Sequence, residues 1–187
     1  MPEDGAVFRL KPRPEQLPRL AQCYLDAQTR DGRRNEDADH VALDAGRRIR
    51  QGDRTKETLK EIVAWKNSES RFWMKIGQTF DGNDTASVTR ALNTVVHTED
   101  PQEAVAILVS LKGIGVPTAS AILAMIFPER YTVIDQRALR AVGIADPETA
   151  FYLLYNAYCR ATAIANKVCL RTLDRALWAS GGRRRPK

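Results

Sequence analysis

The stretch Leu111-Lys112-Gly113-Ile114-Gly115-Val116-Pro117 lies between two apolar segments with helical periodicity. In both segments apolar residues recur three, four and seven positions apart, which is typical of one face of a helix. The residues of this pattern are Ala104, Ile107, Leu108 and Leu111 before the stretch, and Ala119, Ile122, Leu123, Ile126 and Phe127 after it. The two glycines permit a very tight turn, and Pro117 suits the first turn of a helix, where its missing N–H costs nothing. The sequence therefore predicts two helices joined by a hairpin over about residues 104–127.

This hairpin has two interpretations. A turn whose backbone amides point outward, next to a helix N-terminus, favours a bound anion such as a phosphate. The same sequence also suits a tight helical corner that binds no ligand. The hairpin alone does not decide between them.

The composition is typical of a globular domain. With 43% hydrophobic and 28% charged residues in a chain of 187, one compact domain with a sizeable core is expected. No apolar run reaches the length of a membrane span and no signal-peptide pattern opens the chain, so we expect a cytoplasmic protein with no membrane partner, and a monomer. Three widely spaced cysteines exclude a disulfide framework and a four-cysteine metal or iron–sulfur site.

The formal net charge of +6 points only weakly to an anionic partner. Residues 183–187, Arg-Arg-Arg-Pro-Lys, contribute +4 of it and leave +2 for residues 1–182. We expect residues 1–182 to form the domain and residues 183–187 to be a disordered basic tail that adds non-specific affinity for nucleic acid.

The rest of the chain also has the spacing of helices, and no segment shows sustained alternation. The sequence predicts an all-α, compact multi-helix domain. Apart from the hairpin pair, helices are expected over about residues 14–28, 38–51, 55–66, 85–96, 135–142, 148–167 and 170–179, with a further helix starting near 71–76 and an exposed loop over 29–37.

Asp135 stands at the end of a short extended connection, 128–134, that follows the second hairpin helix, and it opens the next helix. Aspartate is a preferred helix N-cap, so a purely structural role explains it. The alternative is a carboxylate held beside an anion-binding hairpin, where it faces a bound nucleotide.

The hairpin sequence Leu111 to Leu123, followed by Val133-Ile134-Asp135, resembles the helix–hairpin–helix superfamily of DNA glycosylases, and the spacing is most similar to the adenine-excising branch. The close match covers about residues 104–142, with the aspartate in the segment 131–142. The resemblance implies that Asp135 supports cleavage of the N-glycosidic bond of a base flipped out of double-stranded DNA.

The resemblance also implies a DNA-binding role for the hairpin. The residues expected to hold a DNA phosphate, through amides or side chains, are Lys112, Gly113, Ile114, Gly115, Val116 and Thr118. Arg137, on the helix after Asp135, is expected either to contact phosphate or to form a surface ion pair. No cofactor is required, although the backbone carbonyls of Val109, Leu111 and Ile114 are candidate ligands of a monovalent cation, K+ or Na+.

Two departures from the family pattern limit the expected chemistry. Bifunctional members of the family carry a Schiff-base lysine two positions after the second glycine, and here Pro117 occupies that position. The four-cysteine iron–sulfur loop of some branches is also absent. The sequence therefore predicts a monofunctional enzyme without an intrinsic lysine-dependent lyase.

A weaker match lies upstream, in Glu61-Ile62-Val63-Ala64-Trp65-Lys66-Asn67. By this resemblance Glu61 protonates the leaving base, whereas a solvated helix residue is the alternative. Lys66 or Asn67 is expected to enter the duplex. The aromatic residues Trp65, Phe72 and Trp73 either stack on the flipped base or pack in the core.

The leading hypothesis is thus a monofunctional DNA glycosylase that removes a damaged, mismatched or modified base, with Asp135 stabilising the transition state or activating water. A non-catalytic helix–hairpin–helix DNA-binding protein is the alternative, and a helical protein–protein adaptor is a third interpretation. The sequence does not indicate which base is removed.

Overall fold

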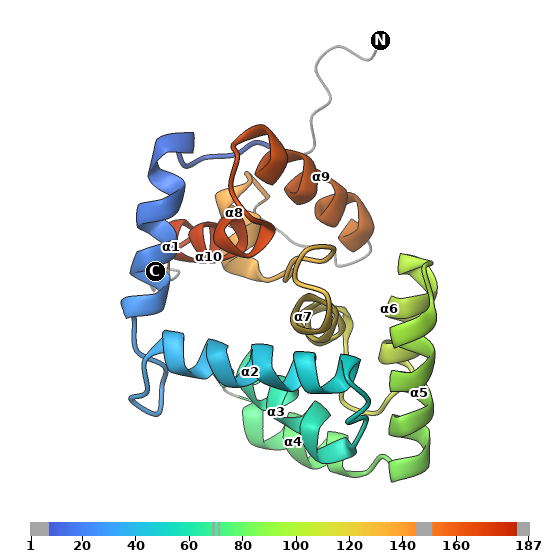
Figure 1. The fold of residues 1–187 in the computed structure, drawn as a ribbon. Helices are drawn as coiled ribbons and strands as arrows, with labels where there is room; N and C mark the ends of the chain where they lie inside the picture. Colours follow the sequence, from blue (N-terminus) through green and yellow to red (C-terminus); the bar gives the residue numbers. More distant parts are fainter. Residues whose placement is uncertain (1–7, 69, 71, 145–150, 183–187) are drawn as a thin grey trace.

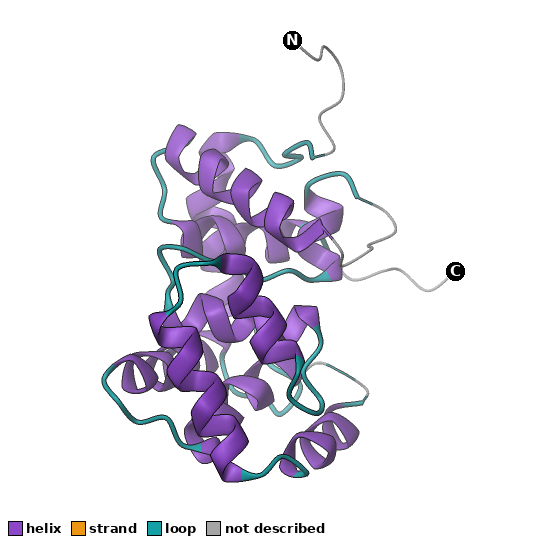
Figure 2. Ribbon diagram, turned by 90° about the vertical axis from the view of Figure 1, so that its right-hand side faces the viewer, coloured by secondary structure: helices purple, strands orange, loops and turns teal. Residues whose placement is uncertain are grey.

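The computed structural model describes residues 8–68, 70, 72–144 and 151–182, and these residues confirm the all-α fold (Figure 1). Ten α-helices and a short 3-10 helix make up the ordered elements of this part of the chain, and Figure 2 shows no strand in it. The elements are η1 (Pro14–Gln16), α1 (Leu17–Asp26), α2 (Asn35–Arg50), α3 (Lys56–Asn67), α4 (Trp73–Asp81), α5 (Thr85–His97), α6 (Pro101–Val109), α7 (Val116–Ile126), α8 (Gln136–Ala141), α9 (Tyr152–Ala165) and α10 (Leu170–Ser180).

Helix α7 lies at the centre of the molecule, where Figure 1 shows it nearly end-on. Every residue from Thr118 to Ile126 is buried, so all faces of this helix contact protein. Helices α2, α3 and α6 pack on α7, while α5 covers α6 and α4 covers α3. A second group forms around α10, which packs on α1, α8 and α9. The segment after α7 connects the two groups.

Side-chain caps define several helix starts where the sequence predicts them. Asp100 accepts the N–H of Gln102 at 2.8 Å at the start of α6, with Pro101 in the first turn. Asp84 accepts the N–H of Ser87 at 2.8 Å at the start of α5. Each such cap contributes about 1 kcal/mol to helix stability.

The prediction that residues 29–37 form an exposed loop is wrong in part. Helix α2 begins at Asn35, three residues before the expected start, and both Thr29 and Asn35 are buried. The Asn35 side chain donates to the carbonyl of Tyr24 at 2.9 Å, and its backbone N–H donates to Ala27 at 2.8 Å. These bonds tie the start of α2 to the end of α1.

Other expected boundaries agree with the described residues to within a few positions. The first residues of the long helix expected over 148–167 lie outside the described residues, and α9 corresponds to the rest of that helix. The basic segment 183–187 also lies outside them. Among the described helices, none is long and apolar enough to cross a membrane.

Candidate active site

The turn between α6 and α7 is fixed by one side chain from a neighbouring turn. The backbone N–H of Lys112 donates to Oδ1 of Asn83 at 2.8 Å, and Nδ2 of Asn83 donates back to the Lys112 carbonyl at 2.9 Å. Gly113 has a φ of +80°, and a Cβ there would lie 2.9 Å from the backbone nitrogen of Phe80. The turn therefore requires glycine at 113 for both conformation and space.

Three backbone amides of this turn have no acceptor within the described part of the chain. They belong to Gly113, Gly115 and Val116. The amides of Ile114 and Thr118 donate to Leu111 and Gly115 respectively. The amides without an acceptor in the described residues are thus fewer than the sequence suggests.

The start of α7 is joined to the Asp135 segment by a serine. The Ser120 hydroxyl donates to the carbonyl of Pro117 at 2.8 Å and accepts the N–H of Ile134 at 3.0 Å. Two residues before Ile134, the buried segment is also held by α9, because the Tyr152 hydroxyl donates to the Thr132 carbonyl at 3.1 Å. Hydrogen bonds in the core therefore fix the position of Asp135 relative to the turn.

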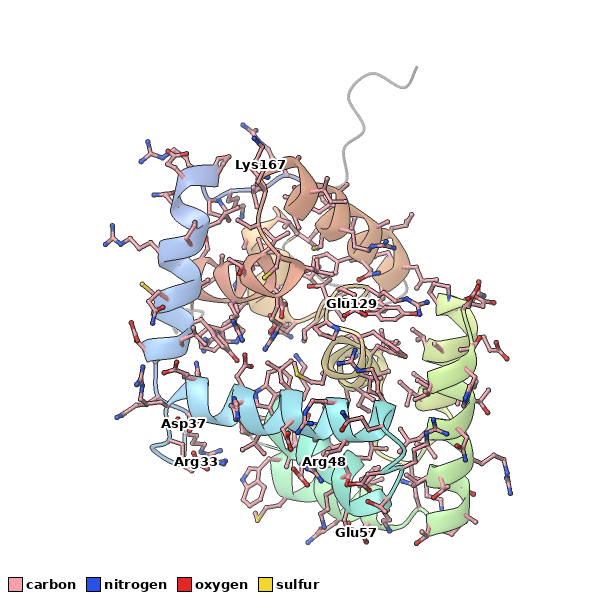
Figure 3. All side chains as sticks on the ribbon, in the orientation of Figure 1. Arg33, Asp37, Arg48, Glu57, Glu129 and Lys167 are labelled. Atoms are coloured by element: carbon pink, nitrogen blue, oxygen red, sulfur yellow. The ribbon has the colours of Figure 1, made fainter. Side chains whose placement is uncertain are left out.

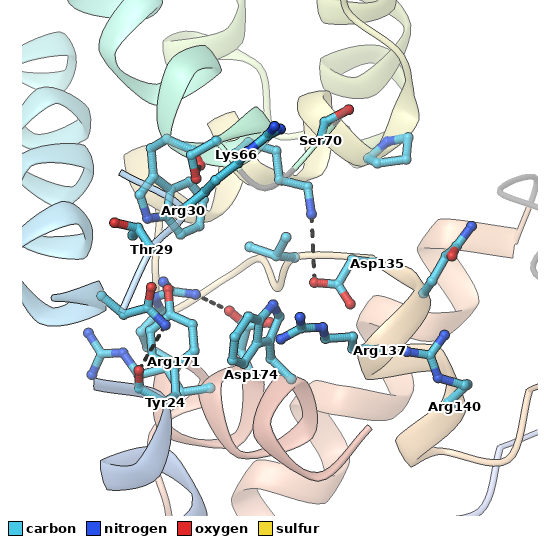
Figure 4. A pocket seen from close by; sticks show the side chains of 18 residues that line it. Tyr24, Thr29, Arg30, Lys66, Ser70, Asp135, Arg137, Arg140, Arg171 and Asp174 are labelled. Atoms are coloured by element: carbon cyan, nitrogen blue, oxygen red, sulfur yellow. Dashed lines mark hydrogen bonds and ion pairs between the residues drawn. The ribbon is translucent and has the colours of Figure 1, made fainter. Parts of the chain in front are cut away.

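Asp135 caps α8 and faces a cavity at the same time. Its Oδ1 accepts the N–H of Ala138 at 2.8 Å, which confirms the predicted cap. Its Oδ2 lies 3.7 Å from Nζ of Lys66, at the last turn of α3 (Figure 4). The side chain is 22% exposed. The two interpretations of Asp135 are compatible, because one oxygen is sufficient for the cap.

The cavity has a volume of about 920 Å³ and lies where the two groups of helices meet. This is large enough for a nucleotide-sized ligand. Its walls come from the end of α1 and the loop after it, the start of α2, the end of α3, the start of α7, the Asp135 segment with α8, and α10. The lining residues are Tyr24, Thr29, Arg30, Asn35, Trp65, Lys66, Ser68, Ser70, Pro117, Val133, Asp135, Gln136, Arg137, Arg140, Arg171, Asp174, Arg175 and Trp178.

Cationic side chains predominate in this lining. Against the carboxylates of Asp135 and Asp174 stand a lysine and several arginines, namely Lys66, Arg30, Arg137, Arg140, Arg171 and Arg175. Ion pairs between some of these cations and carboxylates reduce the excess of positive charge. Because the remaining balance is positive, the cavity favours an anionic ligand.

A buried network of ion pairs forms one wall. Asp39 of α2 is 1% exposed and pairs with Arg171 and, at 2.7 Å, with Arg175. It also accepts the Tyr24 hydroxyl at 3.0 Å, and burial together with the Asp39 carboxylate raises the pKa of Tyr24. Arg171 pairs in addition with Asp174. These contacts fasten α10 to α1 and α2 and hold the wall in one conformation.

Aromatic rings line the cavity on two sides. Trp178 of α10 stacks against the Arg137 guanidinium at 3.8 Å from its ring centroid and meets the Tyr24 ring edge-on at 5.0 Å. Trp65 of α3 also lines the cavity, and its ring centroid lies 5.3 Å from Cζ of Arg171. Aromatic rings and guanidinium planes are the usual stacking surfaces for an extruded base.

Asp174 makes stability depend on pH. Burial raises the pKa of this carboxyl to about 6, and the neighbouring Asp135 and Asp39 carboxylates add to the effect while Arg171 and Lys66 oppose it. At a pH between the ordinary pKa of an aspartate and about 6, Asp174 holds a proton in the folded chain that it has released in the unfolded chain. The free energy of unfolding should therefore fall as pH rises from 4 to 6, by at most about 1.4 kcal/mol per pH unit from this group.

Asp174→Asn is expected to remove that contribution. Urea unfolding of both proteins between pH 4 and 7 should show a smaller decline in the variant. Asp84→Asn is a suitable control, because hydrogen bonds from Ser87 lower the pKa of Asp84 and its stabilisation is instead lost as pH falls. Parallel pH profiles for wild type and Asp174→Asn would contradict the assignment.

Two of the residues expected upstream lie in the cavity, and four lie outside it. Trp65 and Lys66 line it; Lys66 is 12% exposed and pairs with Asp135, and its entry into a duplex stays a prediction. Glu61, Asn67, Phe72 and Trp73 are not among the lining residues.

Local contacts hold two of these four, and the other two are exposed. Glu61 pairs at 2.6 Å with Arg48, which Figure 3 shows at the α2–α3 surface, so its expected role as general acid has no support. Asn67 donates to the Val63 carbonyl of its own helix at 2.8 Å. Phe72 and Trp73 are 53% and 51% exposed, and they belong neither to the lining of the cavity nor to the core.

The residues expected in the hairpin need a similar correction. The side chains of Ile114 and Thr118 are buried and their amides donate within the turn, so neither amide is left for a phosphate, while the DNA-binding role of the turn itself stays a prediction. Lys112 is exposed, and its Nζ lies 3.3 Å from the Gly82 carbonyl. The Leu111 carbonyl, a candidate cation ligand, already accepts the N–H of Ile114 at 3.2 Å, whereas a cation at the Val109 and Ile114 carbonyls stays a prediction.

Sequence reasoning missed the wall contributed by α10. Arg171, Asp174, Arg175 and Trp178 recur three, four and seven positions apart, which places them on one face of the helix. A polar stripe beside the buried apolar residues of the same helix, Leu170, Leu173, Ala176 and Leu177, is the signal that marks this wall.

In comparisons with protein-family models, with curated proteins and with solved structures, the chain matches none.

Proposed function

We propose that this chain is a DNA N-glycosylase whose active site is the cavity beside Asp135. One observation carries the proposal: a carboxylate fixed by a helix cap lies in a cationic, aromatic cavity of nucleotide size. The turn with accessible amides lies at its rim, because Pro117, which follows Gly115 and Val116, lines the cavity. A flipped nucleotide has a phosphate, a sugar and a base. The turn amides suit the phosphate, the Asp135 carboxylate suits the sugar, and the aromatic rings of the lining suit the base.

The chemistry that suits this arrangement is dissociative cleavage of the bond between C1′ and the base. As that bond breaks, positive charge develops on the sugar. The fixed carboxylate of Asp135 stabilises this charge without reorganisation, because its orientation is already set by Ala138 and Lys66. The stacking surfaces of Tyr24, Trp65 and Trp178 offset the cost of extruding the base, which is a few kcal/mol.

An exposed apolar segment beside the cavity also favours a DNA duplex as partner. Phe72, Trp73 and Met74 are each more than half exposed, and Phe72 donates its N–H at 3.1 Å to the hydroxyl of Ser70, a lining residue. Large apolar side chains that project from a DNA-binding surface insert between base steps and unstack them. We assign this role to the segment in place of the expected base stacking by Phe72 and Trp73.

The experiment that tests the proposal measures free base released from duplex oligonucleotides, each with one damaged, mismatched or modified base, against the unmodified duplex. Release of any one base with an abasic product supports the proposal. Binding to these duplexes without release of any base would favour the alternative, a non-catalytic DNA-binding protein. An absence of salt-dependent DNA affinity would favour the protein–protein adaptor.

Gly115→Val is expected to weaken DNA binding about tenfold, the equivalent of one lost phosphate contact of about 1.4 kcal/mol. A Cβ at Gly115 makes only an ordinary contact, 3.8 Å from Pro117, and the backbone there is extended, so the fold tolerates valine. The added side chain obstructs the amides of Gly115 and Val116. Fluorescence anisotropy with an undamaged duplex measures the affinity.

The same substitution at Gly113 serves as a contrast. Gly113→Val meets the backbone of Phe80 and a positive φ, so it should lower the stability of the fold itself. Urea unfolding of both variants separates the two effects. Unchanged affinity in a folded Gly115→Val protein would exclude the turn as the phosphate anchor.

A further inference from the structure

Asn35 is a buried asparagine whose two side-chain ends have different surroundings. It is 7% exposed and lines the cavity at the start of α2. Its Nδ2 donates to the Tyr24 carbonyl at 2.9 Å, and because a carbonyl oxygen only accepts, this contact identifies the nitrogen end of the amide. The oxygen end, Oδ1, accepts no hydrogen bond from the described residues. Oδ1 is also not sealed from solvent, so it opens into the cavity.

A structural role accounts for only one end of this side chain. Nδ2 and the backbone N–H, which donates to the Ala27 carbonyl at 2.8 Å, tie the start of α2 to the end of α1. That attachment needs donors alone. It leaves an acceptor whose orientation is fixed and whose partner is not found in the described part of the chain. Such an acceptor suits a ligand that supplies an N–H.

The other polar groups on this side of the cavity are occupied or exposed. The Thr29 hydroxyl donates within its own loop. Arg175 donates to Asp39 through two N–H groups, at 2.9 Å and 2.7 Å. Arg30 lines the cavity but is exposed. Of these lining residues, Asn35 is the one that combines burial with an unused polar atom.

The position of Asn35 places its oxygen far from the proposed catalytic carboxylate. Figure 4 shows Tyr24 and Thr29 on one side of the cavity and Asp135 on the other, and Asn35 is held by Tyr24. When the sugar faces Asp135, the base extends towards the side of Asn35. The Watson–Crick edge, which is remote from the glycosidic bond, then meets the Asn35 amide. This is the edge that enzymes read on a flipped base.

We propose that Asn35 is a specificity-determining residue whose Oδ1 accepts the N–H at the Watson–Crick edge of the flipped base. This inference rests on the proposed function, because it requires the base to lie in the cavity beside Asp135. Every unmodified base has an N–H on this edge next to an acceptor, and the remaining hydrogen of Nδ2 is available to that acceptor. The substrate class is therefore a base whose Watson–Crick edge is intact, either mispaired or altered at another edge. A base methylated at the edge nitrogen leaves Oδ1 without a donor and is rejected.

The test measures binding, so it does not depend on base release. The full chain is titrated into duplexes whose target nucleotide has a 2′-fluorinated sugar, which resists cleavage because fluorine destabilises positive charge on the sugar. The target faces an abasic site, so that no base pair opposes flipping. Three pairs of bases differ in the edge N–H: adenine and purine, hypoxanthine and 1-methylhypoxanthine, uracil and 3-methyluracil. A duplex without a base at the target position is the reference.

For each base that binds more tightly than the reference, wild type should prefer the member of the pair with the N–H by at least about tenfold. Asn35→Ala should bring this ratio close to one. Asn35→Asp loses the donor to Tyr24 but keeps an acceptor oxygen, so it should retain the preference. Asn166→Ala is the matched control, because Nδ2 of Asn166 donates to the Thr162 carbonyl at 2.7 Å and Asn166 is not a lining residue. This variant should bind as wild type does.

A wild-type ratio close to one, or an Asn35→Ala ratio equal to that of wild type, would overturn the inference. Equal loss of preference in Asn35→Ala and Asn35→Asp, which a purely structural role predicts, would overturn it too, as would binding no tighter than the reference for every base. Base release from an unfluorinated substrate without any preference would overturn it while leaving the glycosylase proposal in place. A preference in binding without base release from any substrate would support Asn35 and count against that proposal.

Discussion

Asp135→Asn is expected to slow base release by on the order of 100-fold or more, the usual cost of removing one preorganised electrostatic group from an active site. The substitution removes the negative charge that opposes the developing charge on the sugar. It keeps the fold, because asparagine caps a helix as well as aspartate does and can still accept the N–H of Ala138. Single-turnover rates on the substrate found by the base-release screen measure the effect.

A second helix cap provides the control for this variant. Asp100 caps α6 as Asp135 caps α8, but its carboxylate is exposed and does not line the cavity. Asp100→Asn should therefore leave base release unchanged, and both variants should unfold at nearly the same urea concentration as wild type. Equal rates for Asp135→Asn and wild type would exclude Asp135 from the chemistry and leave it as a cap alone.

Much of the fold can be predicted from the sequence because its signals are local. Apolar residues at helical spacing, with Asp135 as a cap, mark several helix starts within a few residues. The boundary that was wrong, at Asn35, depends on hydrogen bonds to the end of α1, which no local pattern contains. Tertiary contacts of this kind extend a helix beyond the point at which its own pattern begins.

The site was predictable only in the part that is continuous in sequence. The turn, Pro117 and Asp135 belong to one segment, and Ser120 sets their relative position. The ion pair between Lys66 and Asp135 joins residues far apart in the chain, and the wall of α10 reaches Asp39 across a still longer separation. Such pairings follow from how the helices pack, so a single sequence does not reveal them.

Glu61 shows how packing decides which residues reach the cavity. Glu61 lies in the middle of α3, and its carboxylate accepts a hydrogen bond from Arg48, thirteen residues earlier on α2. One helical turn or so further on, Lys66 lies on a different face of α3 and reaches the cavity instead. The face of the helix, set by packing on α2 and α7, decides which polar residue the cavity receives.

Gly46→Ala is expected to lower the free energy of unfolding by about 3 kcal/mol, at the upper end of the cost of overpacking a core. A Cβ at this position of α2 would lie 2.1 Å from the carbonyl oxygen of Met125 and 2.9 Å from the backbone nitrogen of Ile126. These atoms belong to the backbone of α7, so no side-chain rotation relieves the overlap. The two helices must separate, and α7 also carries Pro117 and Ser120, so base release should fall as well.

Gly77→Ala is the matched control, since Gly77 lies inside α4 and a Cβ there meets nothing within 4 Å. Alanine at that site should stabilise the protein by about 0.5–1 kcal/mol through helix propensity alone. Urea unfolding of both variants measures the free energies of unfolding, provided that the dependence on urea concentration has the same slope. Gly46→Ala should lower the free energy of unfolding and Gly77→Ala should raise it. A Gly46→Ala protein as stable as wild type would show that α2 and α7 have room to separate at little cost, and that the position of the turn relative to Asp135 does not depend on their contact.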